Sequence, residues 1–313
     1  MPQSPYARSR TLVVAFEGWN DAGEAASGAV RRLRDLLDLE PIHETDPEDY
    51  VDYQFSRPIV GVGDDGVRRI VWPGAVVYGP ADPLALPRIP DEAEAGESGA
   101  RVVGENAENI YVLLGTEPAR SWKTFAREIV EVCHTHGIEF AVLLGALLAD
   151  VPHSRPISVF GTSESREVRR AFGVERSSYE GPTGIVGVLA DAFEREGIAT
   201  MSVWASVPHY VHNAPSPKAT LAIVDRLEEV LDVVIPRGDL VEEAAEWESG
   251  IDALADDDDE MATYIEALER ARDAVESPEA SGEAIAKEFE RYLRRGEGGR
   301  GEAGAAGEEP WRS

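Results

Sequence analysis

The stretch TLVVAFEGWNDAGEAASGAVRRLRDLLDL, residues 11–39, carries the strongest structural signal in the chain. It begins with a short apolar and β-branched run, Thr11–Phe16, which is typical of a buried strand. A turn rich in Gly, Asn and Asp follows. Val30, Leu33 and Leu37 then recur at helical spacing. Strand, turn and helix in this order predict the opening of an α/β unit.

The same alternation returns further along the chain and predicts a mostly parallel sheet with helices on both faces, a three-layer α/β/α sandwich spanning residues 1–236. Between the first unit and its repeats we expect a strand-rich region with a hairpin turn at Asp64-Asp65-Gly66. An acidic surface loop is expected over residues 81–108. The expected strands are 51–56, 67–72, 75–80, 109–115, 140–148, 156–161 and 198–207, and the expected helices are 119–136, 163–173, 184–197 and 218–233.

The C-terminal quarter has a different pattern, which predicts an amphipathic helical appendage over residues 237–295. Apolar residues recur with helical spacing from Leu240 to Leu254, again from Met261 to Val275, and in a third short stripe, Ile285, Phe289 and Leu293. These seams must be covered by the same domain, by each other or by another subunit. Residues 296–313 are rich in Gly and Glu and are expected to be disordered. The candidate interface residues are Leu240, Trp247, Ile251, Met261, Ile265 and Leu268.

Composition excludes several function classes. The 313 residues include 59 acidic and 30 basic side chains, a net charge of −29, which disfavours binding to nucleic acid or to an anionic membrane. A single cysteine, Cys133, allows no intramolecular disulfide and no cysteine-based zinc site. The longest apolar run, Phe140–Ala149, is about half of a membrane span. With no signal-peptide pattern at the start, we expect a cytoplasmic protein without a metal or cofactor.

Polar and aromatic side chains gather in the loops that should follow the strands, where open α/β sheets bind ligands. If these loops converge, they form an enzyme-like cleft. In that case a carboxylate–histidine pair should face an open pocket. Otherwise they are ordinary polar loops, in which Asn20, Asp21 or Thr183 caps a helix. The catalytic candidates are Glu17, Asp21, His153, Arg155 and Glu180; the candidates for lining a ligand cleft are Trp19, Asn20, Glu117, Tyr179, Thr183, His209 and Tyr210.

Four segments together resemble the proteasome assembly chaperone 2 family in its actinobacterial form, over roughly residues 11–232. They are VVAFEGWNDAGEAA, LLGALLADVPHSRP, YEGPTGIVGVLADAF and SVWASVPHYVHNAPSPKATLAIV. The resemblance implies a phosphorylase/hydrolase-like sandwich and an assembly factor that binds proteasome α-type subunits and forms homo- or hetero-oligomers. It brings no catalytic residues. Members often dock through a tail of the form hydrophobic–Tyr–any residue, whereas Pro310-Trp311-Arg312-Ser313 has Arg312 at the Tyr position.

Three functions follow as hypotheses. The first is a non-catalytic, self-associating protein-binding factor, with a trimer as one form of the homo-oligomer. The second is a hydrolase or transferase that acts on a small polar substrate in the strand-end cleft. The third is a nucleotide sensor that uses the two glycine-bearing helix starts near residues 18–24 and 181–187.

Overall fold

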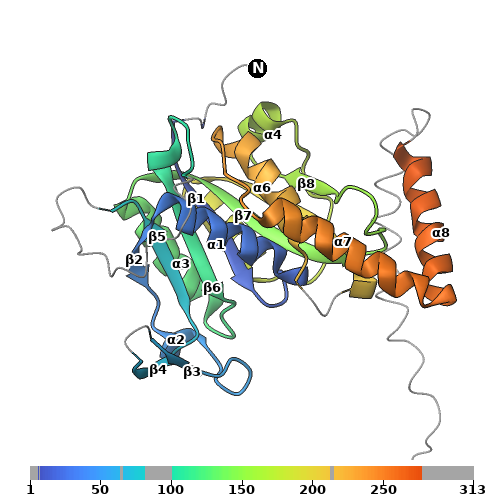
Figure 1. Cartoon of the computed structure of the whole chain (residues 1–313). Coiled ribbons are helices and arrows are strands. Elements are labelled where there is room, and N and C mark those ends of the chain that lie inside the picture. The colour runs from blue at the N-terminus through green and yellow to red at the C-terminus, as the bar shows by residue number, and fades with distance from the viewer. Residues whose placement is uncertain (1–5, 7, 64–65, 82–100, 212–214, 277–313) are drawn as a thin grey trace, which may run out of the picture.

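The fold is centred on a seven-stranded sheet, seen here in a computed structural model that describes residues 6, 8–63, 66–81, 101–211 and 215–276 (Figure 1). The strand order across the sheet is β2-β5-β6-β1-β7-β9-β8. The strands are β1 (Arg10–Glu17), β2 (Glu40–Glu44), β5 (Ala75–Gly79), β6 (Ile110–Thr116), β7 (Ile138–Ala149), β8 (Val159–Thr162) and β9 (Ala199–Pro208).

The first predicted strand, β1, occupies the middle of this sheet. It pairs in parallel with β6 on one side and with β7 on the other, and β7 continues in parallel to β9. All six residues from Thr11 to Phe16 are buried, as expected for a strand covered on both faces. The strands expected at 109–115, 140–148 and 198–207 are confirmed as β6, β7 and β9.

The prediction of a mostly parallel sheet is wrong, because the sheet is mixed. The pairs β2–β5, β5–β6 and β8–β9 are antiparallel. A parallel neighbour requires a crossover of a dozen or more residues. The loop from β7 to β8 has only nine residues, 150–158, so β8 returns in the opposite direction and pairs with the far side of β9.

Helices flank the sheet on both faces, as the alternation predicted (Figure 1). On one face, α1 (Ala25–Leu37) and α6 (Pro217–Leu231) pack against Val13 and Ala15 of β1. On the other face, α3 (Trp122–Thr135) and α5 (Ile185–Arg195) pack against Leu12, Val14 and Phe16. Successive side chains of a strand point to opposite faces, so β1 contributes to both cores. A shorter helix, α4 (Arg166–Phe172), follows β8.

The two C-terminal helices pack on this framework. The first, α7 (Leu240–Asp256), lies against α6, and α8 (Asp259–Glu276) follows it. Leu240, Ile251, Ile265 and Leu268 are buried within the chain itself, while Trp247 and Met261 are half-buried. The chain itself therefore covers these four side chains, which is one of the three ways of covering the seams that the sequence left open. The third stripe and residues 296–313 lie outside the described residues.

A separate two-stranded sheet, β3 (Ile59–Val62) paired with β4 (Arg68–Val71), projects from one end of the molecule (Figure 1). Asp64 and Asp65, expected at its turn, lie outside the described residues. The strand expected at 51–56 is wrong. That segment forms turns after the short helix α2 (Pro47–Tyr50), held by bonds such as Phe55 N–H to Asp52 O.

The expected acidic surface loop at 81–108 is largely outside the described residues, but its end belongs to the framework. Val102 is buried in the core, and Val103 pairs with Val234 as an isolated bridge. A one-turn helix, η2 (Ala107–Asn109), then leads into β6. Among the described helices, none combines the length and the apolar content needed to cross a membrane.

Candidate functional site

A large open groove of about 2400 Å³ runs along the carboxyl ends of β1 and β7 and past β8. Its wall includes the turn Gly18–Gly23, the end of β7 and the segment before α5. Loops at strand ends form this edge, as open α/β sheets lead one to expect. Five of the twelve candidate site residues line it: Trp19, Asn20, Asp21, Tyr179 and Thr183.

Asp21 is buried and serves as a helix cap. Its Oδ1 accepts bonds from the backbone N–H groups of Ala26 at 2.8 Å and Ser27 at 3.1 Å, in the first turn of α1. This is the capping role that the sequence left open, although the one-turn helix η1 (Ala22–Glu24) separates the residue from α1. Its second oxygen, Oδ2, has no partner among the described residues. Burial raises the pKa of Asp21, and the bonds from Ser27 and Ala26 oppose that rise.

Glu117, in the loop after β6, caps the other helix start. Its Oε1 accepts from the backbone N–H of Ile185 at 3.0 Å, at the beginning of α5, and from Asn20 Nδ2 at 3.2 Å. Thr183, the residue expected to cap this helix, makes no side-chain cap bond there. A Cβ at Gly184 would lie 2.5 Å from Asn20 Nδ2, so a larger residue there would force the buried Asn20 side chain to shift.

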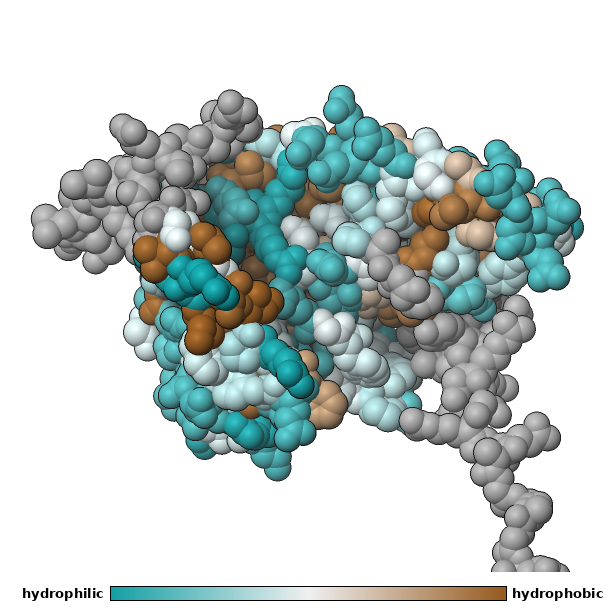
Figure 2. All heavy atoms as spheres, turned by 60° about the horizontal axis from the view of Figure 1, so that its bottom comes forward, coloured by the Kyte–Doolittle hydropathy of each residue, from teal (hydrophilic) through white to brown (hydrophobic). Residues whose placement is uncertain are grey.

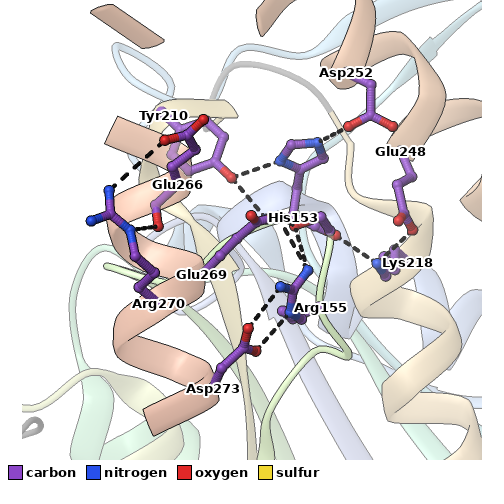
Figure 3. Close-up of polar contacts among 11 residues, drawn as sticks. His153, Arg155, Tyr210, Lys218, Glu248, Asp252, Glu266, Glu269, Arg270 and Asp273 are labelled. Atoms are coloured by element: carbon purple, nitrogen blue, oxygen red, sulfur yellow. Dashed lines mark hydrogen bonds and ion pairs between the residues drawn. The ribbon is translucent and has the colours of Figure 1, made fainter. Parts of the chain in front are cut away.

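His153 is held inside the structure rather than presented to the groove. Its side chain is 1% exposed. Nδ1 lies 2.8 Å from the Tyr210 hydroxyl, and Nε2 lies 2.9 Å from Asp252 Oδ1 on α7 (Figure 3). Burial raises the pKa of Tyr210 to about 12, so its phenol stays protonated at neutral pH. The His153 carbonyl accepts from Lys218, which also pairs with Glu248 of α7.

Arg155 ties the same loop to α8. Its guanidinium makes a two-pronged bond to Asp273, at 2.8 and 2.9 Å, and a further bond to Glu269 at 3.2 Å (Figure 3). Hydrogen bonding from Arg155 lowers the pKa of Asp273. His153, Arg155 and Lys218 therefore form a polar tether between the 150–156 loop, α6 and the two C-terminal helices.

The remaining candidates are dispersed. Glu17 pairs with Arg31 of α1, and Glu180 is exposed in the segment before α5. His209, in the one-turn helix η3 (His209–Val211), lies 3.4 Å from Asp150 and packs edge-on against Tyr264 of α8. Of the five catalytic candidates, only Asp21 lines the groove. His153 and Asp252 lie within hydrogen-bond distance, as a catalytic carboxylate–histidine pair would, but the imidazole is buried and does not face the groove.

Two aromatic residues stand at the rim of the groove. Trp19 is 68% exposed and Tyr179 is 40% exposed. The Tyr179 hydroxyl donates to the carbonyl of Pro182 at 2.9 Å, which fixes the ring over its own turn. In the described part of the chain no three His, Cys, Asp or Glu side chains cluster as a metal site would require. Burial raises the pKa of Cys133 to about 12, so this thiol is poorly suited to act as a nucleophile.

The residues that sequence reasoning missed are the acidic partners on the C-terminal helices: Glu248, Asp252, Glu269 and Asp273. Many other carboxylates share these helices, and helical spacing alone does not mark these four. Only the positions of His153, Arg155 and Lys218 in the fold identify them.

The pattern of the PAC2 family matches residues 15–255. A PAC2 family protein from Streptomyces avermitilis is 41% identical, with a TM-score of 0.68, over 81% of this chain and 98% of that one. A proteasome-assembly chaperone homologue from Mycobacterium tuberculosis is 39% identical, with a TM-score of 0.65, over 82% and 99%. PbaA from Pyrococcus furiosus, described as an archaeal homologue of proteasome-assembly chaperone, is 19% identical with a TM-score of 0.53, over 85% of this chain and 96% of that one, and shares the fold. No curated protein matches the chain.

Replacing Asp21 with asparagine should make the protein more stable at neutral pH. The raised pKa means that the folded state binds the proton more tightly than the unfolded state, so the charged carboxylate costs stability above its folded pKa. The asparagine side chain keeps an oxygen for Ala26 and Ser27. In urea unfolding, the advantage of Asp21→Asn should shrink as the pH falls through the pKa of Asp21. Asp257→Asn, at an exposed carboxylate, is the control, and equal pH profiles for both variants would contradict the assignment.

Replacing Lys218 with methionine should weaken the tether. The substitution keeps the apolar stem but leaves the His153 carbonyl and Glu248 without their donor, which should lower the free energy of unfolding by about 1–3 kcal/mol. Backbone amides of α7 should also exchange faster with deuterium. Lys123→Met removes an exposed lysine from α3 and serves as the matched control. If both variants unfold alike and α7 exchange is unchanged, the tether does not hold the helices.

Proposed function

The chain belongs to the PAC2 family, and from this premise we propose that it is a non-catalytic protein-binding factor that acts as a proteasome assembly chaperone. One observation supports this above all others. The Mycobacterium tuberculosis protein described as a proteasome-assembly chaperone homologue is 39% identical to it and aligns over 99% of its own length. The partners that we propose are proteasome α-type subunits and other copies of the same chain, a trimer being one form, in the cytoplasm.

The use of polar side chains in the strand-end loops supports a binding role over a catalytic one. Asp21 and Glu117 are engaged as helix caps, and His153 and Arg155 in holding α7 and α8. The alternative, a hydrolase or transferase for a small polar substrate, needs these groups to meet in an open pocket. Four of its five candidates do not line the groove, so it has less support.

The nucleotide-sensor hypothesis also has less support. An anion binds at a helix start through free N–H groups and the positive end of the helix dipole. Here a carboxylate already accepts N–H bonds at both starts, Asp21 at α1 and Glu117 at α5. A phosphate would have to displace or closely approach a negative group at either place. The sequence resemblance also implies a phosphorylase/hydrolase-like sandwich. We propose this likeness for the fold alone and assign no ligand from it.

Purified proteasome α-type subunits from the same cell should bind the chain directly. We expect co-elution in size-exclusion chromatography with light scattering, with a complex mass larger than that of either component. Proteasome β-type subunits and an unrelated protein of similar net charge are the controls. Binding to neither type of subunit would overturn the chaperone assignment. We expect Asp21→Asn to bind as well as the natural chain, because Asp21 is buried and its carboxylate is engaged as a helix cap.

A further inference from the structure

Helix α8 forms part of one wall of the groove but buries little of its own surface. Its residues Tyr264, Leu268, Ala271 and Arg272 line the groove. Of the side chains of α8 that the structure describes, only Ile265 and Leu268 are buried. Among the described helices and strands, α8 packs most closely against α7. Figure 2 shows mostly hydrophilic atoms at the right-hand end of the molecule, where α8 lies.

A two-residue connection, Asp257-Asp258, joins α8 to α7, and both residues are exposed. The carboxylate of Asp258 caps the new helix. Its Oδ1 accepts from the backbone N–H groups of Glu260 at 3.0 Å and Met261 at 3.1 Å. Because the cap comes from the connection itself, α8 keeps its first turn satisfied when it moves relative to α7. The connection therefore has the properties of a hinge.

Arg155 attaches the far end of α8 to the loop after β7 (Figure 3). Its guanidinium bonds to both oxygens of Asp273, at 2.8 and 2.9 Å, and to Glu269 at 3.2 Å. It is the only lysine or arginine among residues 149–165. The side chains of Arg155 and Asp273 are 31% and 54% exposed, so water competes for this ion pair. Asp273 lies about 22 Å along the helix axis from the hinge, where a single attachment has the greatest leverage.

Tyr264 makes a second contact with the same side of the groove, closer to the hinge. Its hydroxyl donates to Asp150 Oδ1 at 3.3 Å, and its ring packs edge-on against His209 and Tyr210. The residue is 38% exposed. This contact fixes the direction in which α8 lies when it is closed, but it leaves the far end of the helix to Arg155.

The preceding helix, α7, is held by groups that are better shielded from water. His153, 1% exposed, bonds to Asp252, and Lys218, 16% exposed, pairs with Glu248. The helix also packs directly on α6. Partly exposed ion pairs contribute little to stability compared with shielded bonds and packed side chains. We therefore expect α8 to separate from the groove while α7 stays in place.

We propose that α8 is a strap that closes one end of the groove and opens about the Asp257-Asp258 hinge when Arg155 releases it. In the closed state Leu268 forms part of the groove wall. In the open state the groove gains an entrance at this end, while α7 and the sheet keep their structure. The family pattern ends at residue 255, so the strap lies beyond the part of the chain that it matches. The strap controls access to the groove whichever partner the chain binds.

A thiol placed on the groove side of α8 tests the proposal. The chain has one cysteine, Cys133, which is fully buried and whose pKa burial raises to about 12, so an introduced thiol reacts selectively. Leu268→Cys should react slowly with N-ethylmaleimide. Adding Arg155→Met, which keeps an apolar stem but removes the ion pair, should raise that rate at least about fivefold. Ala267→Cys, at the exposed neighbouring position, gives the rate of an open thiol and should not respond to Arg155→Met.

Hydrogen exchange in chains without an introduced cysteine shows whether Leu268→Cys opens the strap by itself. In the natural chain the amides of α8 should exchange faster than those of α7, and Arg155→Met should speed exchange in α8 only. Arg270→Met removes the same charge from a side chain of α8 that is 74% exposed, and it should change neither measurement.

Three results would overturn the proposal. In the first, α8 of the natural chain is as protected from exchange as α7. In the second, Arg155→Met leaves both the labelling rate and the exchange of α8 unchanged, so that Arg155 does not hold the strap. In the third, Arg155→Met also exposes Cys133 to the reagent or removes the protection of α7, because the domain then opens as a whole.

Discussion

The burial of β1 on both faces is the constraint on which the rest of the structure depends. Leu12, Val13 and Val14 are fully buried, and Phe16 is nearly so. Covering an aliphatic or aromatic side chain of this size contributes about 1.5–3 kcal/mol. A strand in the middle of a sheet can bury both sets of side chains only if helices pack on both faces. The packing of α1 and α6 on one side and of α3 and α5 on the other follows from this requirement.

The same arrangement determines how the strand-end polar groups are used. Where β1 and β6 end, the chain turns close to the starts of α1 and α5, each of which has N–H groups without helical partners. Buried N–H groups must find acceptors, and Asp21 and Glu117 supply them. The loop after β7 is similarly bound to α6, α7 and α8 through His153, Lys218 and Arg155. A set of side chains that looks catalytic in the sequence thus stabilises helix starts and helix packing.

The sequence predicted those features that are set by local spacing. Three elements could be identified because burial sets the spacing of apolar residues along a strand or helix. They are β1 and β7, from their apolar runs, and α1, from the helical spacing of Val30 and Leu33. Sequence reasoning missed β2, which contains Pro41 and is not fully buried along any part of its length, and it assigned a strand to residues 51–56, where turns occur. Strand direction was also missed, because periodicity carries no information about it.

In the candidate site, a contact could be predicted from the sequence only where its two residues lie close together along the chain. Asp21 lies five residues from Ala26, and its capping role could be anticipated. Glu117 caps a helix 68 residues away, and His153 meets Asp252 across 99 residues, so only the tertiary fold brings these pairs together. The interface candidates show the same limit. An amphipathic seam establishes that Leu240 and Ile251 must be covered, but not that the chain itself covers them.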